Sequence, residues 1–299
     1  MSDSAFRAGF IALAGRPNVG KSTLLNALVG RKLSIVTAKP QTTRRRVLGI
    51  KTLPAAQLIF VDTPGLHSGE RRAINRSMNR AAVAAASEAD LCALVVEALH
   101  WNDDDELALK RLRELRCPLG LVINKIDRCK PRAALLPFLE DLKVRHDFRF
   151  MVPVSAESGE NLPELERTLV ENLPLSSPLF PKDQITDQDD MLRAAEFVRE
   201  QLMIALREEL PYSVAVQVEE FTVEGNLLRI SATIWVERES QKAIVIGEGG
   251  GQLKNIGRAA RLAMEHELGK KVFLKLWVKL REDWADDERA LAALGIEQA

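Results

Sequence analysis

The sequence predicts two domains: an α/β domain whose mostly parallel sheet is covered by helices on both faces, followed by a smaller α+β domain. The length of 299 residues suits two domains, and a hydrophobic content of 46% is enough for sizeable cores. Short apolar runs alternate with stretches of helical spacing up to about residue 172. A polar stretch with several prolines then interrupts this pattern, and strands and helices follow in a different order.

In the first domain, five apolar runs are each followed by a polar loop, and we expect them to form buried strands of the parallel sheet. These runs are residues 10–14, 57–61, 91–96, 119–123 and 150–154. Helical spacing is found at residues 21–29, 74–87, 105–115, 133–143 and 163–172. The run 46–51, followed by Pro54, predicts a hairpin that adds an antiparallel edge strand to the sheet.

The boundary between the domains is predicted from the stretch 172–190, which holds three prolines and many polar residues. This composition is typical of a linker. We therefore place the first domain at residues 5–175, the linker at 176–190 and the second domain at 191–299. The elements expected in the second domain are a helix at 191–210, strands at 214–220 and 227–236, a short helix at 242–246, a helix at 252–268 and a strand at 272–278.

The charge balance and the cysteine pattern argue against several classes of protein. Lys plus Arg and Asp plus Glu both number 42, so any contact with nucleic acid must come from a local basic patch. Cys92, Cys117 and Cys129 form no CxxC pair, and we expect them to be reduced thiols. No run approaches the roughly 18 apolar residues of a membrane span. The sequence therefore predicts a cytoplasmic protein.

A phosphate-binding loop is predicted between the first strand and the first helix. The segment matches the pattern GxxxxGK[ST], in which glycines and backbone N–H groups wrap around phosphates at a helix N-terminus. Lys21 should reach the β- and γ-phosphates, and the Ser22 hydroxyl should ligate Mg²⁺. The segment consists of Gly15, Arg16, Pro17, Asn18, Val19, Gly20, Lys21 and Ser22, with Thr23 after it.

A second motif, Asp62-Thr63-Pro64-Gly65, follows the strand at 57–61. A carboxylate at the carboxyl end of this strand can hold Mg²⁺, and the Gly65 N–H group can contact a γ-phosphate. The next residue, Leu66, is apolar and cannot orient an attacking water molecule, so we expect any intrinsic hydrolysis of the γ-phosphate to be slow.

A third motif predicts that the base is guanine. Asn124, Lys125 and Asp127 follow the strand at 119–123, and the Asp127 carboxylate can accept both N1–H and N2–H of guanine. Adenine lacks this pair of donors, so the carboxylate would stay unpaired with ATP. Ser155 and Ala156 follow a further strand and could offer a backbone N–H to guanine O6. An ATP-using kinase or ATPase remains the alternative.

These motifs resemble those of the translation-factor-like GTPases and, more closely, the Era family. The likeness extends through QTTRRR at 41–46, residues 62–82, FPKDQITD, ELPYSV and the C-terminal WADDERALAALG. It implies GTP or GDP with Mg²⁺ as ligands, and Thr42 or Thr43 as the residue that completes the Mg²⁺ shell. Lys21, Ser22, Asp62 and Gly65 would be the other catalytic groups. It also implies that Asn18 could hold K⁺.

In the second domain, Gly247-Glu248-Gly249-Gly250 fits the GxxG loop of KH domains, which presses against about four nucleotides. By resemblance this is a type II KH domain that binds the 3′ end of 16S-type small-subunit rRNA. Residues 241–281 carry nine Lys and Arg against three Asp and Glu, whereas residues 190–299 carry 15 against 19. The candidate phosphate contacts in this basic stripe are Lys254, Arg258, Arg261, Lys270, Lys271 and Lys275.

The resemblance further implies a switch that assists 30S subunit assembly and rRNA maturation. It allows peripheral contact with the inner membrane and a monomer or weak dimer. Another ribosome-associated GTPase, or an RNA-binding chaperone with little turnover, is the alternative. In the first domain, Glu97 occupies a position where the family has Asp. In the second domain, we expect Trp235 and Trp277 to lie in the core.

Overall fold

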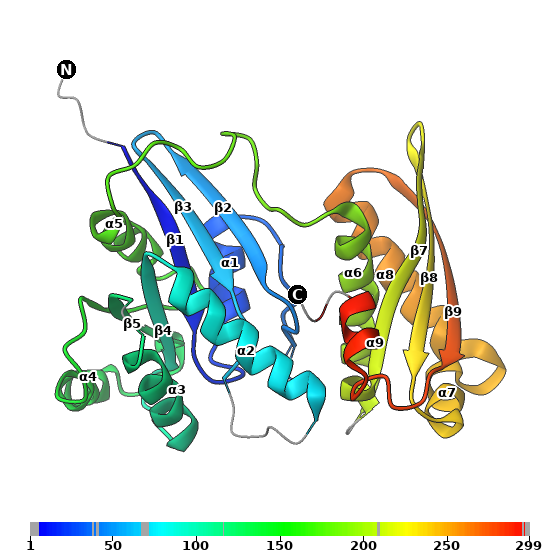
Figure 1. Ribbon diagram of the computed structural model, residues 1–299, viewed down its shortest axis with the longest axis horizontal. Helices are drawn as coiled ribbons and strands as arrows, with labels where there is room; N and C mark the ends of the chain where they lie inside the picture. The colour runs from blue at the N-terminus through cyan, green and yellow to red at the C-terminus, as the bar shows by residue number, and fades with distance from the viewer. Residues whose placement is uncertain are drawn as a thin grey trace. The chain divides into compact units, whose positions relative to one another are not determined.

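The computed structural model describes residues 6–37, 39, 42–66, 72–115, 117–207, 210–294 and 296 (Figure 1). Gln41, residues 67–71, Glu209 and Gly295, which belong to the segments that resemble those of the Era family, lie outside the described residues. The contacts divide the chain into two units. The first holds Met1–Ser34, Thr43–Arg71 and Asn75–Asp187, and the second holds Ile35–Thr42, Arg72–Ile74 and Gln188–Ala299.

The first unit is built on a six-stranded sheet of order β2-β3-β1-β4-β5-β6. Among the described strands of this sheet, only β2 runs antiparallel to its neighbour, which confirms the predicted mostly parallel sheet with an antiparallel edge strand. The strands are β1 (Arg7–Ala14), β2 (Val47–Leu53), β3 (Ala56–Asp62), β4 (Leu91–Glu97), β5 (Leu119–Asn124) and β6 (Met151–Pro153).

Helices cover both faces of this sheet (Figure 1). They are α1 (Lys21–Val29), α2 (Ala73–Glu88), α3 (Asp103–Arg113), α4 (Leu135–Lys143) and α5 (Leu162–Asn172). In β4, Ala93 and Val95 join one apolar cluster with α1 and α5. The alternate residues Cys92, Leu94 and Val96 join another cluster with α2, α3 and α4. This burial on both faces explains why the strands are continuous apolar runs in the sequence.

The first part of the predicted linker is fastened to the sheet of the first unit. Gln57 of β3 is fully buried, and its side chain accepts hydrogen bonds from Leu179 N (2.7 Å) and Phe180 N (2.9 Å). Ile50 N of β2 donates to Ile185 O at 2.9 Å. These bonds satisfy backbone groups that an extended, proline-containing segment cannot satisfy by itself. The sequence predicts a linker over 176–190, but the structure groups the segment up to Asp187 with the first unit.

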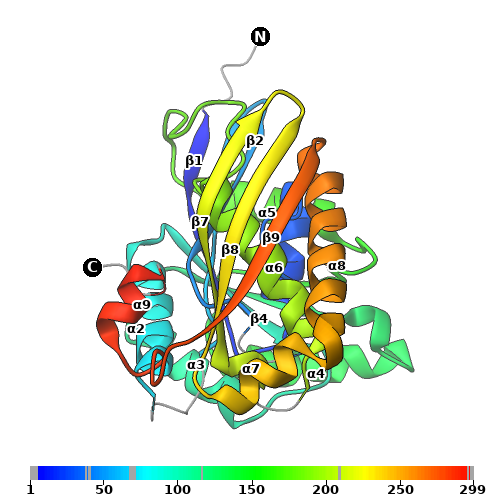
Figure 2. The ribbon, with the colours of Figure 1, turned by 90° about the vertical axis from the view of Figure 1, so that its right-hand side faces the viewer.

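The second unit contains a three-stranded sheet of order β7-β8-β9, with β7 antiparallel and β9 parallel to β8 (Figure 2). Its strands are β7 (Val214–Glu224), β8 (Leu227–Val236) and β9 (Lys271–Leu280). Its helices are α6 (Asp190–Ala205), α7 (Glu239–Ile246), α8 (Gly251–Leu268) and α9 (Glu288–Ala293). The helix expected at 191–210 ends at Ala205, because the next residue, Leu206, adopts an extended backbone and buries its side chain.

One face of this sheet forms the core of the second unit. Alternate residues of β8, among them Ile230 and Ile234, are buried against α6 and α8, as their spacing predicts. The other face is open to solvent: Trp277 of β9 is 49% exposed. The expectation that Trp277 is a core residue is therefore wrong, because its position in β9 points it away from the helices. Trp235 is half-buried on the same outer face, where its indole N–H donates to Gln217.

Among the described residues, no helix combines the length and apolar character that crossing a membrane requires.

Candidate nucleotide and RNA sites

The predicted phosphate-binding loop connects the end of β1 to the start of α1. Gly15 has a φ of +144°, and a Cβ there would come within 2.3 Å of Val95 O. Gly20 has a φ of +98°, and its Cβ would lie 2.3 Å from Asn124 Nδ2. Both positions therefore require glycine, because a side chain would meet both backbone strain and a direct clash. The loop is held close to the strands whose ends carry the other motifs.

Lys21 is buried and lies across the loop that precedes it. Its ammonium group donates to Gly15 O and Arg16 O, both at 3.0 Å. Burial lowers the pKa of Lys21 to about 8, while the Asp62 carboxylate acts in the opposite direction. A cation held by weak carbonyl acceptors, next to backbone N–H groups, is well placed to bind an anionic phosphate.

Three oxygen-bearing side chains meet at the end of β3. Ser22 Oγ donates to Asp62 Oδ2 at 2.7 Å and lies 2.8 Å from Thr43 Oγ1. Asp62 is fully buried, and desolvation raises its pKa despite the hydrogen bond from Ser22. Its other oxygen, Oδ1, has no hydrogen-bond partner among the described residues. A buried carboxylate oxygen without a partner, beside two hydroxyls, fits a hard cation such as Mg²⁺.

The structure separates the two threonines that the sequence could not tell apart. Thr43 reaches Ser22 and Asp62, the latter at 3.4 Å. The Thr42 hydroxyl instead donates to Lys39 O at 2.6 Å and contacts Thr37 Oγ1 at 2.8 Å. Thr43 is therefore the threonine that the structure brings to the predicted metal site, and Thr42 is not.

The segment after Asp62 packs against the phosphate-binding loop. Leu66 N donates to Gly15 O at 3.1 Å, and the Leu66 side chain is buried in the apolar cluster that includes α2. A Cβ on Gly65 would come within 2.7 Å of Pro17 N. The Thr63 hydroxyl donates to Leu13 O. An apolar, buried Leu66 cannot orient a water molecule, in agreement with the expectation from the sequence.

The side chain of Asn124 ties together three loops at the carboxyl edge of the sheet. Its amide nitrogen donates to Val19 O at 2.9 Å, and its oxygen accepts from Ala156 N at 3.0 Å. Ser155 N donates to Glu160 O at 3.0 Å. The sequence suggests that one of these two amide groups is available for guanine O6, whereas here both already donate within the protein. Either would have to change partner to bind the base.

Asp127 has the geometry expected of a base-recognising carboxylate. Its Oδ1 is buried and has no hydrogen-bond partner among the described residues, while Oδ2 lies 3.9 Å from Arg128 Nε. An oxygen that is shielded from water and lacks a donor carries a desolvation cost. Two N–H donors on one edge of a purine would remove that cost, and guanine provides them.

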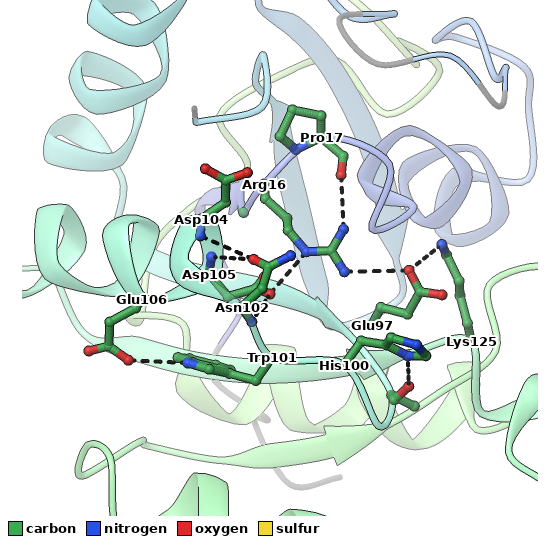
Figure 3. A network of polar contacts seen from close by, with 12 residues as sticks. Arg16, Pro17, Glu97, His100, Trp101, Asn102, Asp104, Asp105, Glu106 and Lys125 are labelled. Atoms are coloured by element: carbon green, nitrogen blue, oxygen red, sulfur yellow. Dashed lines mark hydrogen bonds and ion pairs between the residues drawn. The ribbon is translucent and has the colours of Figure 1, made fainter. Parts of the chain in front are cut away.

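A charged network joins the phosphate-binding loop to the turn at Asn124–Asp127, which is predicted to recognise the base (Figure 3). No spacing in the sequence indicates these connections. Arg16 Nε donates to Asp105 Oδ2 at 2.9 Å, and its Nη2 lies 3.5 Å from Glu97 Oε2. The same Glu97 oxygen accepts from Lys125 Nζ at 2.8 Å. Desolvation raises the pKa of Glu97, but the hydrogen bond and positive charge of Lys125, together with the charge of Arg16, outweigh it. The pKa of Glu97 is therefore lowered. Asp105 is buried at the start of α3, where Asn102 caps the helix.

The GxxG loop lies between α7 and α8, as predicted. Gly247 has a φ of +73°, and a Cβ there would meet Gln252 at 2.5 Å. Gly249 and Gly250 also have positive φ, but a Cβ on either would have no neighbour within 4 Å. The tip of the loop is thus sterically open to a strand of nucleic acid, and Glu248 is exposed beside it.

The predicted phosphate contacts fall into two groups. Lys254 and Arg258 are exposed and lie one turn apart on α8, so they share a face of the helix. Arg261 continues this face but pairs with Glu265 at 3.0 Å. The others are outside α8: Lys270 is partly exposed after the helix, and Lys271 and Lys275 are exposed on β9.

Together, the first unit has the phosphate loop, the buried carboxylate with its hydroxyls and the turn predicted to recognise the base at one edge of a parallel sheet. That arrangement defines the class of P-loop GTPases, and the second unit adds the helix–GxxG–helix arrangement of a KH domain.

Comparisons with known proteins agree with this class. A model of the family described as 50S ribosome-binding GTPase matches residues 10–125, and a KH domain model matches residues 209–285. The protein named GTPase Era of Stenotrophomonas maltophilia (strain K279a) is 55% identical over 289 residues, covering 97% of each chain. The protein of the same name from Xanthomonas oryzae pv. oryzae (strain MAFF 311018) is 52% identical over 297 residues, covering 99% of each.

Among solved structures, Era in complex with MgGDPNP and nucleotides 1506–1542 of 16S ribosomal RNA matches with a TM-score of 0.95. The identity is 41%, and the match covers 98% of this chain and 100% of that chain. A variant of Aquifex aeolicus Era bound to GDP and AlF4⁻ matches equally well. The chain belongs to the Era family of GTPases, and it is an enzyme that hydrolyses GTP.

Proposed function

We propose that this chain is a GTP-operated switch that binds the 3′ end region of small-subunit ribosomal RNA and assists 30S subunit assembly and rRNA maturation. The observation that carries the nucleotide half of the proposal is the pair of buried carboxylate oxygens, Asp62 Oδ1 and Asp127 Oδ1, that lack partners among the described residues. One suits a metal ion and the other suits guanine. A related structure of Era contains MgGDPNP and 16S rRNA nucleotides.

In this proposal, Ser22, Thr43 and Asp62 hold Mg²⁺, which supplies positive charge beside the phosphates. Lys21 neutralises the β- and γ-phosphates, and the Gly65 N–H group contacts the γ-phosphate. The loop residues 15–20 and Thr23 surround the phosphates with backbone N–H groups. Asp127 accepts from guanine, while Asn124 and Lys125 hold the base pocket in shape.

Intrinsic hydrolysis should be slow, because Leu66 is buried and cannot position water. We propose that a partner or a cation reorganises the site. Asn18, which adopts a left-handed backbone at φ 64° in the loop, is the residue that we assign to K⁺. Comparing the GTP turnover rate in K⁺ and Na⁺ at equal ionic strength tests this assignment, and equal rates would remove it.

The RNA half of the proposal is supported by the open GxxG loop between α7 and α8 and by the exposed cations Lys254 and Arg258 after it. KH domains bind unpaired nucleotides, so the target is single-stranded RNA. Glu248 makes the loop itself acidic, and the phosphate contacts should come from α8. We also infer a cytoplasmic location, with any contact with the inner membrane peripheral, and a monomer or weak dimer.

The test combines two measurements on the full-length protein. A phosphate-release assay with GTP, with and without RNA ending in the 16S 3′ sequence, measures turnover. A titration of the same RNA with GDP or a non-hydrolysable GTP analogue measures whether the nucleotide changes RNA affinity. Lys21→Ala should abolish GTP binding while the RNA still binds. RNA binding without any turnover would instead favour a chaperone, and tighter binding of ATP than GTP would refute the nucleotide assignment.

A further inference from the structure

The outer face of the β7-β8-β9 sheet carries a row of alternating cationic and aromatic side chains. On β9, the five residues that point away from the helices are all exposed, and Phe273 and Trp277 are 52% and 49% exposed. Rings of this size are normally buried, so two half-exposed rings on one strand indicate a binding surface. The row consists of Lys271, Phe273, Lys275, Trp277 and Lys279.

Cations lie over the rings of this face. Lys275 Nζ is 4.8 Å from the centroid of the Trp277 ring, and Lys279 Nζ is 5.7 Å from that of Trp235. Arg229, which is opposite Phe273 in the parallel register of β8 and β9, has its guanidinium 5.6 Å from the Phe273 centroid. Arg229 also pairs with Glu224 at 2.7 Å, so Lys275 is the cation of this group that adds positive charge beside an accessible ring.

The acidic residues of the sheet limit where an anionic ligand can lie. The ten residues of β9 include no Asp or Glu, whereas β7 carries Glu219, Glu220 and Glu224. Glu219 lies 3.3 Å from Lys279, and Glu220 accepts from Ser231 on β8. Negative charge on β7 would repel a phosphate chain. A polyanion is therefore confined to β9 and the adjoining half of β8.

We propose that this face is a second binding site for unpaired RNA, with bases stacked on Phe273 and Trp277 and phosphates near Lys271 and Lys275. Two residues of a strand rise about 6.6 Å, so the two rings stand about 13 Å apart along β9. The row is thus long enough for an extended strand of RNA with one base on each ring.

The site is separate from the GxxG groove. Helix α8, which begins directly after the GxxG loop, packs on the opposite face of the sheet through Ile256, Ala260 and Met264 (Figure 2). The inference rests on the proposed RNA-binding function and deepens it: a long RNA would contact both the GxxG loop and the outer sheet face. RNA is favoured over a protein partner because RNA offers flat bases and phosphates in regular alternation, as β9 offers rings and ammonium groups.

The test measures the affinity of full-length protein for two RNAs. One is a long RNA of the 16S 3′ end region, and the other is a short oligonucleotide of about four nucleotides, the length that a GxxG loop contacts. The variant F273A/W277A removes both rings. Val223→Ala removes an equally exposed apolar side chain from β7 and is the matched control. Gly249→Asp places negative charge in the GxxG loop, and F273W/W277F keeps both ring surfaces.

We expect F273A/W277A to bind the long RNA at least about 25-fold more weakly than wild type, since each of the two stacked bases contributes about fivefold or more. Binding of the short oligonucleotide should not change, and F273W/W277F should bind like wild type. Lys275→Ala should lower the slope of log affinity against log salt by about 0.7, the value for one phosphate contact on a single strand. Ultraviolet crosslinks from the long RNA should map to β9.

If Gly249→Asp loses RNA while F273A/W277A binds the long RNA like wild type, the second site is refuted and the proposed function stands. The outer sheet face would then be a candidate binding surface for a protein partner. If neither Gly249→Asp nor F273A/W277A changes RNA affinity, the RNA binds elsewhere, and both the GxxG assignment and this second site are refuted. A loss in F273A/W277A that F273W/W277F does not restore would also refute stacking.

Discussion

Raising the pH from 7 to 9 should weaken nucleotide binding through Lys21. Burial lowers the pKa of this lysine to about 8 in the nucleotide-free protein. The phosphates of a bound nucleotide favour the charged ammonium, so they keep the lysine protonated in the complex. At pH 7 the free protein already carries this proton, whereas at pH 9 it must take up nearly one proton to bind.

The expected change is a loss of about tenfold in GDP affinity between pH 7 and pH 9, or about 1.4 kcal/mol. Isothermal titration calorimetry at pH 9 in two buffers of different ionisation enthalpy should show the uptake of almost one proton. The matched control is Lys21→Arg, because a guanidinium stays charged over this range and should bind with less pH dependence. Wild-type affinity that is flat from pH 7 to 9, or an equal slope in Lys21→Arg, would refute the reasoning.

Four further predictions follow from the site. First, a lysine whose pKa falls from 10.5 to about 8 on folding destabilises the nucleotide-free protein below pH 8. Its free energy of unfolding should therefore rise by about 3 kcal/mol between pH 8 and 10.5, relative to Lys21→Met; denaturant titrations that show no such difference would contradict this. Second, Asp127→Asn should reverse the preference for GTP over xanthosine triphosphate in a competition titration, and an unchanged preference would remove Asp127 from base recognition. Third, Glu97→Gln should weaken GDP binding roughly fivefold, because the acceptor of the hydrogen bond from Lys125 loses its negative charge. The neighbouring change Glu106→Gln should have little effect, and equal losses in both variants would point to general damage. Fourth, Thr43→Ala should raise the Mg²⁺ concentration needed for half-maximal GTP turnover about tenfold, and more than Thr42→Ala does; the reverse order would overturn the assignment of Thr43.

The motifs that could be predicted from the sequence are those made by consecutive residues. The loop from Gly15 to Ser22 is defined by its spacing, since a strand, a glycine turn and a helix follow each other within a few residues. The order of parallel strands then brings Asp62 and Asp127 to the same edge, because carboxyl ends of parallel strands lie together. The class of nucleotide therefore follows from local chemistry, before any distant contact is known.

The choice between neighbouring residues needed the folded chain. Thr42 and Thr43 have the same side chain and adjacent places, and only the packing of their segment decides which hydroxyl reaches Ser22. The linker is a similar case. Its prolines and polar residues indicate an irregular segment, but its attachment depends on Gln57, which is more than a hundred residues away and buried in β3.

The exposure of Trp277 in the second domain is another feature that could not be predicted from the sequence. Its size favours burial, yet Val272 on the other side of β9 is buried and Trp277 is half-exposed. The sequence by itself determined the two domains, the phosphate loop and the GxxG loop, and it predicts Asp127 as the carboxylate that recognises the base. Only the tertiary structure decided which threonine meets Asp62, that Glu97 joins Arg16 to Lys125, and which face of β9 is open. The physical reason is that these features depend on contacts between residues far apart in the chain, and such contacts leave no fixed spacing in the sequence.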